Sequence, residues 1–170
     1  MKIIGLDLSL TSTGVSCEGR TTVLASKNKG ALRLSDYRTQ ITQVCLTENV
    51  THAVIEGYAF ASRNSHAHSI GELGGVVRLV LFDLNIPYVE VPPTSRAKFA
   101  TGRGNAGKNE VISAISAKTG LVFSGGSGND ECDAWILEQM ALTKLGLSGY
   151  TWTKEQVSAL DKVDWSALER

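Results

Sequence analysis

The sequence has few of the residues that stabilise very small or fibrous proteins. Its 170 residues include three cysteines, three prolines and 6% aromatic side chains. Cys17, Cys45 and Cys132 are odd in number and far apart, and no CxxC motif or neighbouring pair of histidines accompanies them. This pattern excludes a disulfide framework and a cysteine-based zinc site. We interpret the three cysteines as small core residues.

Long apolar runs are also missing. No stretch reaches the roughly 18 residues that suggest a membrane-spanning helix. The first ten residues already carry Lys2 and Asp7 within a strand-like segment, unlike a signal peptide. Hydrophobic residues make up 42% of the chain and charged residues 20%, which is typical of a folded globular domain. We therefore expect a soluble, cytoplasmic protein without membrane contacts.

Net charge is absent as well, because 17 basic side chains balance 17 acidic ones. The distribution is nevertheless uneven. Residues 96–118 carry five basic side chains and one acidic one, whereas acidic side chains outnumber basic ones in residues 119–170. Local clusters set the field that a ligand meets. The neutral total thus does not exclude a polyanionic partner, although a solvated helix face is the simpler interpretation of this charge alone.

Hydrophobic periodicity predicts an α/β fold. Strands are expected at 2–8, 13–18, 21–26, 52–56 and 86–91, and helices at 31–49, 69–84, 93–100, 108–119 and 129–145. Three hairpin-linked strands followed by alternating strands and helices predict a mixed five-stranded sheet, a three-strand meander plus parallel strands, flanked by helices. We divide the chain into a main domain at 1–146 and a short helical C-terminal appendage at 147–170, with a capping box at Thr153–Gln156.

Two local features of the expected helices lead to specific predictions. Gly71, Gly74 and Gly75 would each weaken a helix interior, so they predict close packing of this helix against another backbone. Asn129 or Asp130 is the expected N-cap of the helix that starts near 129.

Four carboxylates stand at the ends of expected elements. Asp7 lies in or at the end of an apolar strand, Glu56 ends another, and Asp130 and Asp133 share one face of a helix start. If the four converged, their mutual repulsion would raise their pKa values unless a hard divalent cation neutralised them. Each acid also has a structural interpretation: Asp130 as a helix cap, Asp133 as a charge at a helix N-terminus, and Glu56 in an ion pair.

The order of these motifs carries a family resemblance. Over about residues 1–145, the chain resembles the RuvC family of Holliday-junction resolvases, which have a ribonuclease H-like fold. The residues that carry it are Ile4-Gly5-Leu6-Asp7, Ser9, Thr13-Gly14, Val54-Ile55-Glu56, Asp130-Glu131-Cys132-Asp133-Ala134, and Lys98 and Lys108 around a glycine-containing loop. One departure is Asp7-Leu8-Ser9, where the family usually has Asp-Pro-Gly or a similar turn.

This resemblance implies a crossover junction endodeoxyribonuclease. Asp7, Glu56, Asp130 and Asp133 are then the catalytic acids, binding Mg²⁺ (or Mn²⁺ as a substitute), with two ions per site, and Lys108 is a further catalytic residue. The expected partners are branched DNA, especially four-way junctions, and a second copy of the chain in a homodimer. The residues expected to contact the DNA backbone are Arg63, Arg96, Lys98, Arg103 and Lys108. Tyr58 or Phe60 is expected to stack on an unpaired base.

Three other functions stay open from the sequence. A fork or flap endonuclease of the same fold would use the same metal chemistry with looser structure selectivity. A nucleotide-binding protein of the actin–hexokinase type also begins with an acidic hairpin, but it needs two such domains and a longer chain. A catalytically inactive DNA-binding module would not require all four acids.

Overall fold

The computed structural model describes residues 1–57 and 66–169. Its centre is a five-stranded sheet with the order β3-β2-β1-β4-β5. The meander β1 (Ile3–Asp7), β2 (Thr13–Cys17) and β3 (Arg20–Leu24) is antiparallel, and β4 (His52–Glu56) and β5 (Tyr88–Val91) continue the sheet in parallel from β1. The predicted mixed sheet is confirmed.

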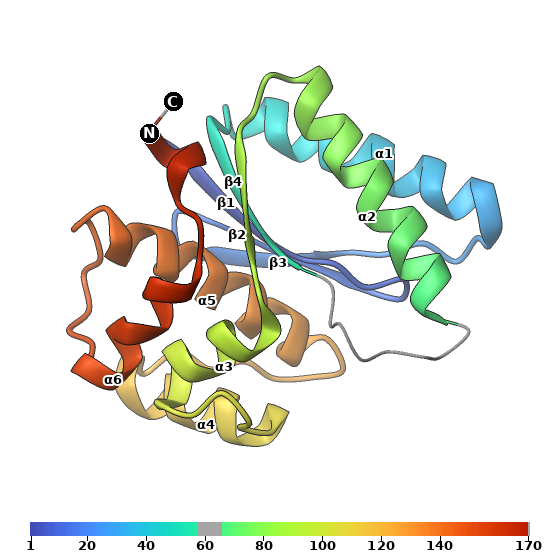
Figure 1. Ribbon diagram of the computed structural model, residues 1–170. Helices are drawn as coiled ribbons and strands as arrows, with labels where there is room; N and C mark the ends of the chain where they lie inside the picture. The colour runs from blue at the N-terminus through green and yellow to red at the C-terminus, as the bar shows by residue number, and fades with distance from the viewer. Residues whose placement is uncertain (58–65, 170) are drawn as a thin grey trace.

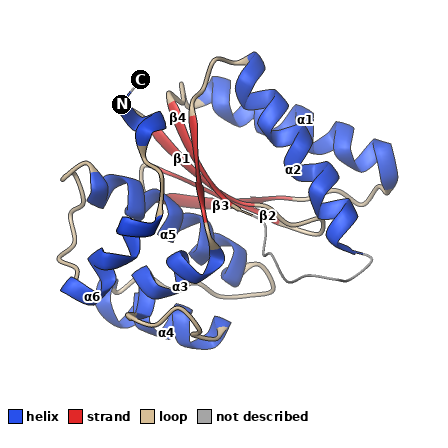
Figure 2. Ribbon diagram, viewed as in Figure 1, coloured by secondary structure: helices blue, strands red, loops and turns tan. Residues whose placement is uncertain are grey.

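Helices cover both faces of this sheet (Figure 1). One face carries α1 (Gly30–Thr47) and α2 (His66–Asp83). The other carries α3 (Pro93–Thr101), α4 (Lys108–Thr119), α5 (Gly128–Lys144) and α6 (Lys154–Val157), and two 3₁₀ helices follow at Ser158–Lys162 and Ser166–Glu169. Figure 2 shows the sheet as the middle layer of three. Among the described helices, none is long and apolar enough to cross a membrane.

The sheet has a hydrophobic core on each face, because its central strands are buried on both sides. On β4, Ala53 and Ile55 belong to the core beneath α1 and α2, and Val54 belongs to the core beneath α5. The three cysteines are free and buried in these cores, as expected.

Two glycines let α5 lie directly on the meander. A Cβ atom at Gly5 would stand 2.1 Å from the carbonyl oxygen of Ala134, and one at Gly14 would stand 2.0 Å from that of Asp130. Real Cβ atoms do not approach backbone so closely, so only glycine permits this contact. The start of α5 is thereby fixed over the end of β1 and the beginning of β2.

Of the three α2 glycines expected to pack closely, Gly74 is buried, but the expected contact is not found at the other two. At Gly71 and Gly75 on α2, no atom of the described residues outside the local backbone lies within 4 Å of an added Cβ. Neither glycine is therefore required by close contact with a described backbone. Whether a glycine faces the core or open space depends on tertiary packing, which helix propensity does not report.

The expected N-cap of α5 was also wrong. The helix begins at Gly128 with Ser127 as its N-cap, so Asn129 and Asp130 lie inside the first turn. The reason is Gly128 itself, since an added Cβ there would stand 2.9 Å from the carbonyl carbon of Phe123. This glycine lets the preceding loop fold back on the helix start.

The C-terminal segment packs against α3 and α5. The rings of Trp152 and Phe99 are 4.3 Å apart between centroids, and Leu160 and Trp165 join the core beneath α5. The predicted capping box at Thr153 is formed, and the Gln156 side chain donates a hydrogen bond to the Ala100 carbonyl (2.9 Å). The boundary at residue 146 stays a prediction, and residues 147–169 contribute directly to the core.

We expect Gly14→Ala to destabilise the fold by about 1–3 kcal/mol or more, because the new methyl group would overlap the Asp130 carbonyl oxygen. Chemical denaturation measures this. Gly126→Ala is the matched control, since no described atom beyond its chain neighbours lies within 4 Å of an added Cβ, and we expect a change below about 0.5 kcal/mol. Equal stability of the two variants would contradict the close contact.

Candidate active site

The strand register brings the first two acids together. β1 and β4 run parallel, with Leu6 opposite Ile55, so Asp7 and Glu56 are the next residues on two neighbouring strands. Adjacent strands lie about 4.8 Å apart, and both acids stand at the carboxyl ends. In α/β folds this edge of the sheet is where ligands commonly bind.

The helix α5 brings the other two acids to the same place. Asp7 pairs with Gly14 across the hairpin, and the backbone of Asp130 rests on Gly14. Asp133 lies on the next turn of the same helix face. The four acids predicted from the sequence therefore converge from β1, β4 and α5.

Burial and repulsion act strongly on this cluster. Burial raises the pKa of Asp7 well above its usual value, and the neighbouring charges of Glu56, Asp133 and Asp130 raise it further, while Arg96 opposes the shift. Burial also raises the pKa of Asp133 to about 6, against the lowering effect of Arg96. Charged carboxylates in this position are costly to the folded protein without a compensating cation.

Arg96 supplies positive charge inside the cluster. Its Nε donates to Glu56 and its Nη1 donates to Asp133, and the side chain is 12% exposed. From the sequence this arginine is expected to contact the DNA backbone, whereas in the structure its guanidinium lies between two of the acids. The helical spacing did indicate this buried position. Arg96 precedes the buried residues Phe99 and Ala100 by three and four positions, so it lies toward the buried side of α3.

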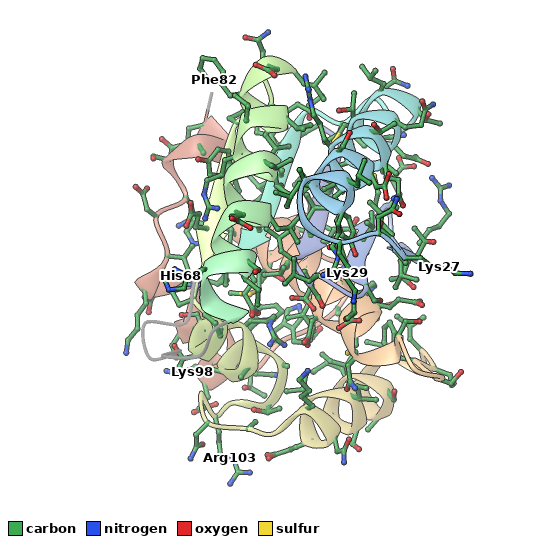
Figure 3. The ribbon with its side chains drawn as sticks, turned by 90° about the vertical axis from the view of Figure 1, so that its right-hand side faces the viewer. Lys27, Lys29, His68, Phe82, Lys98 and Arg103 are labelled. Carbon is green, nitrogen blue, oxygen red and sulfur yellow. The ribbon has the colours of Figure 1, made fainter. Side chains whose placement is uncertain are left out.

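The other predicted basic residues in the described part of the chain lie on α3, on α4 and in the loop between them. Lys108 begins α4 and is exposed, and its charge acts on the Asp133 carboxyl. Lys98 lines a cleft with Lys162 from the C-terminal segment, and Arg103 is exposed and pairs with Glu110. Figure 3 shows Lys98 and Arg103 near one end of the molecule and Phe82 at the other. Tyr58, Phe60 and Arg63 lie outside the described residues.

The four carboxylates are chemically suited to bind a hard divalent cation. Four carboxylates offer the oxygen ligands that Mg²⁺ prefers, and the favourable contacts with a guanidinium show that the cluster accepts positive charge. As arranged, however, no group of three or more His, Cys, Asp or Glu side chains in the described parts of the chain could hold a metal ion. Arg96 lies where two of the carboxylates would otherwise face a shared cation.

The sheet order and the acids at its edge define a protein of ribonuclease H-like fold with a clustered acidic site. Solved structures share this fold. Thermus thermophilus RuvC aligns with a TM-score of 0.68 at 18% identity, over 90% of this chain and 100% of that one. The same protein in complex with a Holliday junction substrate also aligns with a TM-score of 0.68, at 16% identity over 90% of this chain and 99% of that one.

Sequence relatives point the same way, although no family model matches the chain. A crossover junction endodeoxyribonuclease RuvC from Carboxydothermus hydrogenoformans is 29% identical over 86% of this chain and 98% of its own length. One from Prochlorococcus marinus strain NATL1A is 27% identical over 68% of this chain and 81% of its own. In sequence and in fold, the chain is therefore similar to RuvC proteins.

We expect Asp7→Asn to stabilise the protein by roughly 1 kcal/mol at pH 8 in the presence of EDTA, because it removes a buried charge that its neighbours repel. Urea denaturation measures the change. Asp36→Asn is the control: hydrogen bonds from Ser26 and Asn28 lower the pKa of Asp36, so its charge is favoured and the substitution gives no gain. An Asp7→Asn variant less stable than the parent would contradict the repulsion.

Proposed function

We propose that the chain is a structure-selective endodeoxyribonuclease that resolves four-way DNA junctions by paired phosphodiester hydrolysis. The observation that supports this most directly is the convergence of Asp7, Glu56, Asp130 and Asp133 at one sheet edge. The relatives are named crossover junction endodeoxyribonucleases, and one RuvC was solved with a Holliday junction substrate. Action on DNA is consistent with a cytoplasmic protein.

The four acids are the proposed holders of the metal. We propose Mg²⁺, with Mn²⁺ as a substitute, at two ions per site, since paired hard cations fit a cluster of carboxylates. When bound, such ions activate water and stabilise the charge on a phosphate under in-line attack. The protein's own contribution is to keep Asp7 and Asp133 buried and fixed on rigid elements, so that the ligands need little reorganisation.

Basic residues of α3, of α4 and of the loop between them supply the DNA contacts in this proposal. Lys108, already close enough to act on Asp133, is placed to stabilise charge at the scissile phosphate. Lys98 and Arg103 contact the backbone, which gives strong salt dependence and little sequence information. Arg63 for the backbone and Tyr58 or Phe60 for base stacking complete the set as predictions from the sequence.

Paired cleavage of two opposing strands requires two sites, and we propose a homodimer. The helix α2 offers a face for it: Leu79 is 54% exposed and Phe82 is 77% exposed, and residues three apart share a helix face. Phe82 projects outward at the end of α2 (Figure 3). Gly75 is exposed on the same helix, and no described atom lies within 4 Å of an added Cβ there, which leaves room for a partner helix.

We expect Asp7→Asn to reduce cleavage of a labelled four-way junction in Mg²⁺ by on the order of 100-fold or more, while junction binding in Ca²⁺ or EDTA persists. Mutation of a residue that only hydrogen-bonds to a metal ligand lowers metal affinity or activity by about 10–100-fold. We therefore expect the loss of a ligand itself to lower activity at least as much. Splayed-fork and linear-duplex substrates run in parallel. Equal cleavage of fork and junction would favour the general branched-DNA endonuclease.

Glu131→Gln is the matched control for this experiment. Glu131 is on the same turn of α5, but its carboxylate accepts hydrogen bonds from Thr21 (2.8 Å) and Ser127 (3.3 Å), away from the acid cluster. Its cleavage rate should stay within about 2-fold of the parent, since it lies off the site. Loss of cleavage in both variants would point to a folding defect. Cleavage by Asp7→Asn at the wild-type rate would show that the acid cluster is not the catalytic site.

We expect Phe82→Glu to convert a dimer to a monomer, because a charge at the centre of an apolar interface is left without a partner. Light scattering after size exclusion measures the mass. Val122→Glu is the control, since Val122 is 83% exposed but precedes α5 and is not part of α2. A parent protein that is monomeric at micromolar concentration, or a dimeric Phe82→Glu variant, would contradict this interface.

A further inference from the structure

The site of the proposed function contains a cation of its own. Arg96 contacts two of the four acids through two different nitrogens of one planar guanidinium. An arginine fork of this kind matches carboxylates well and cannot lose its proton under ordinary conditions. The Arg96 side chain is 12% exposed, and those of its partners Glu56 and Asp133 are 19% and 8% exposed.

We propose that Arg96 is an internal counterion that holds the acid cluster together in the metal-free protein and competes with divalent metal for Glu56 and Asp133. This inference rests on the proposed function, because it concerns the same acids. Its basis is geometric: the carboxylate oxygens that face the guanidinium are the ones that a cation between Glu56 and Asp133 would need.

The exchange follows from charge and space. A buried cluster of acids repels itself, and one arginine offsets part of this repulsion. A divalent ion brings twice the charge, so it neutralises the cluster better and repels the guanidinium from the same space. Metal binding therefore carries the cost of breaking two ion pairs, and this cost lowers the apparent metal affinity of the site.

The fold allows Arg96 to leave without a change in the backbone. Ser95, Ala97, Phe99 and Ala100 are buried and fix α3 against its neighbours, so release takes place by rotation of a long side chain. Lys98 stands two residues further along the same helix, on a cleft open to solvent. Because residues two apart on a helix do not share a face, Lys98 does not block this rotation.

The test compares Arg96→Gln with Arg78→Gln in the full chain and without DNA. Arg78 is the matched control, a largely buried arginine (19% exposed) whose Nε donates to Glu90 (2.8 Å) on β5. Mn²⁺ binding is followed by electron paramagnetic resonance and calorimetry, and thermal unfolding is followed in EDTA and in saturating Mg²⁺.

We expect Arg96→Gln to lower the melting temperature in EDTA, to bind Mn²⁺ several-fold more tightly than the parent, and to gain more stability from Mg²⁺. Arg78→Gln should bind Mn²⁺ as the parent does. If Arg96→Gln folds only with metal, that result also supports the counterion role. Unchanged or weaker Mn²⁺ binding by a folded Arg96→Gln variant would overturn the proposal, since the arginine would then support the ligands instead of competing.

A second measurement uses the parent protein alone. The Arg96 Nε–H signal in a ¹⁵N–¹H spectrum, assigned by its loss in Arg96→Lys, should be protected from exchange in EDTA and lose this protection on titration with Mg²⁺. Protection that persists at saturating metal would contradict the exchange. Neither measurement uses DNA, so the two proposals can fail separately. If metal displaces Arg96 but the protein does not cut four-way junctions, the proposed function is wrong and this inference still holds.

Discussion

The contact of α5 with the meander is the constraint on which the rest of the site depends. Gly5 and Gly14 remove the side chains that would otherwise keep this helix at an ordinary distance from the sheet. The helix start is therefore pressed onto β1 and β2, and its two acids lie beside Asp7. A helix held at the usual spacing of about 10 Å between layers would carry the same carboxylates too far away to share a cation.

A consequence of this contact is that stability and chemistry oppose each other at the same residues. The packing that buries Asp7 and Asp133 raises the pKa of both carboxyls, so the metal-free protein bears a local cost. Proteins commonly carry such a cost at functional sites. Here the cost is reduced from within, because Arg96 reaches the cluster from a third element, α3.

Much of this arrangement could be predicted from the sequence because it depends on local pattern. Apolar periodicity located all five strands to within about two residues, and the acids at element ends indicated where they would meet. What could not be predicted depends on tertiary contacts. The sequence did not distinguish Gly5 and Gly14, which touch a helix, from Gly71 and Gly75, which face open space. Arg96 was expected to contact the DNA backbone, because a side chain that reaches from α3 to β4 leaves no short-range sequence pattern beyond its position on the buried face of the helix.

The hydrogen bond from Gln156 to the Ala100 carbonyl joins residues 56 positions apart in the chain. Together with the packing of Trp152 on Phe99, it makes α3 and the C-terminal segment one cooperative unit in local unfolding. Contacts of such long sequence separation are slow to form, because loop closure must precede them. Arg96 is carried on this unit, so loosening of the C-terminal segment would also loosen the arginine that pairs with Glu56 and Asp133.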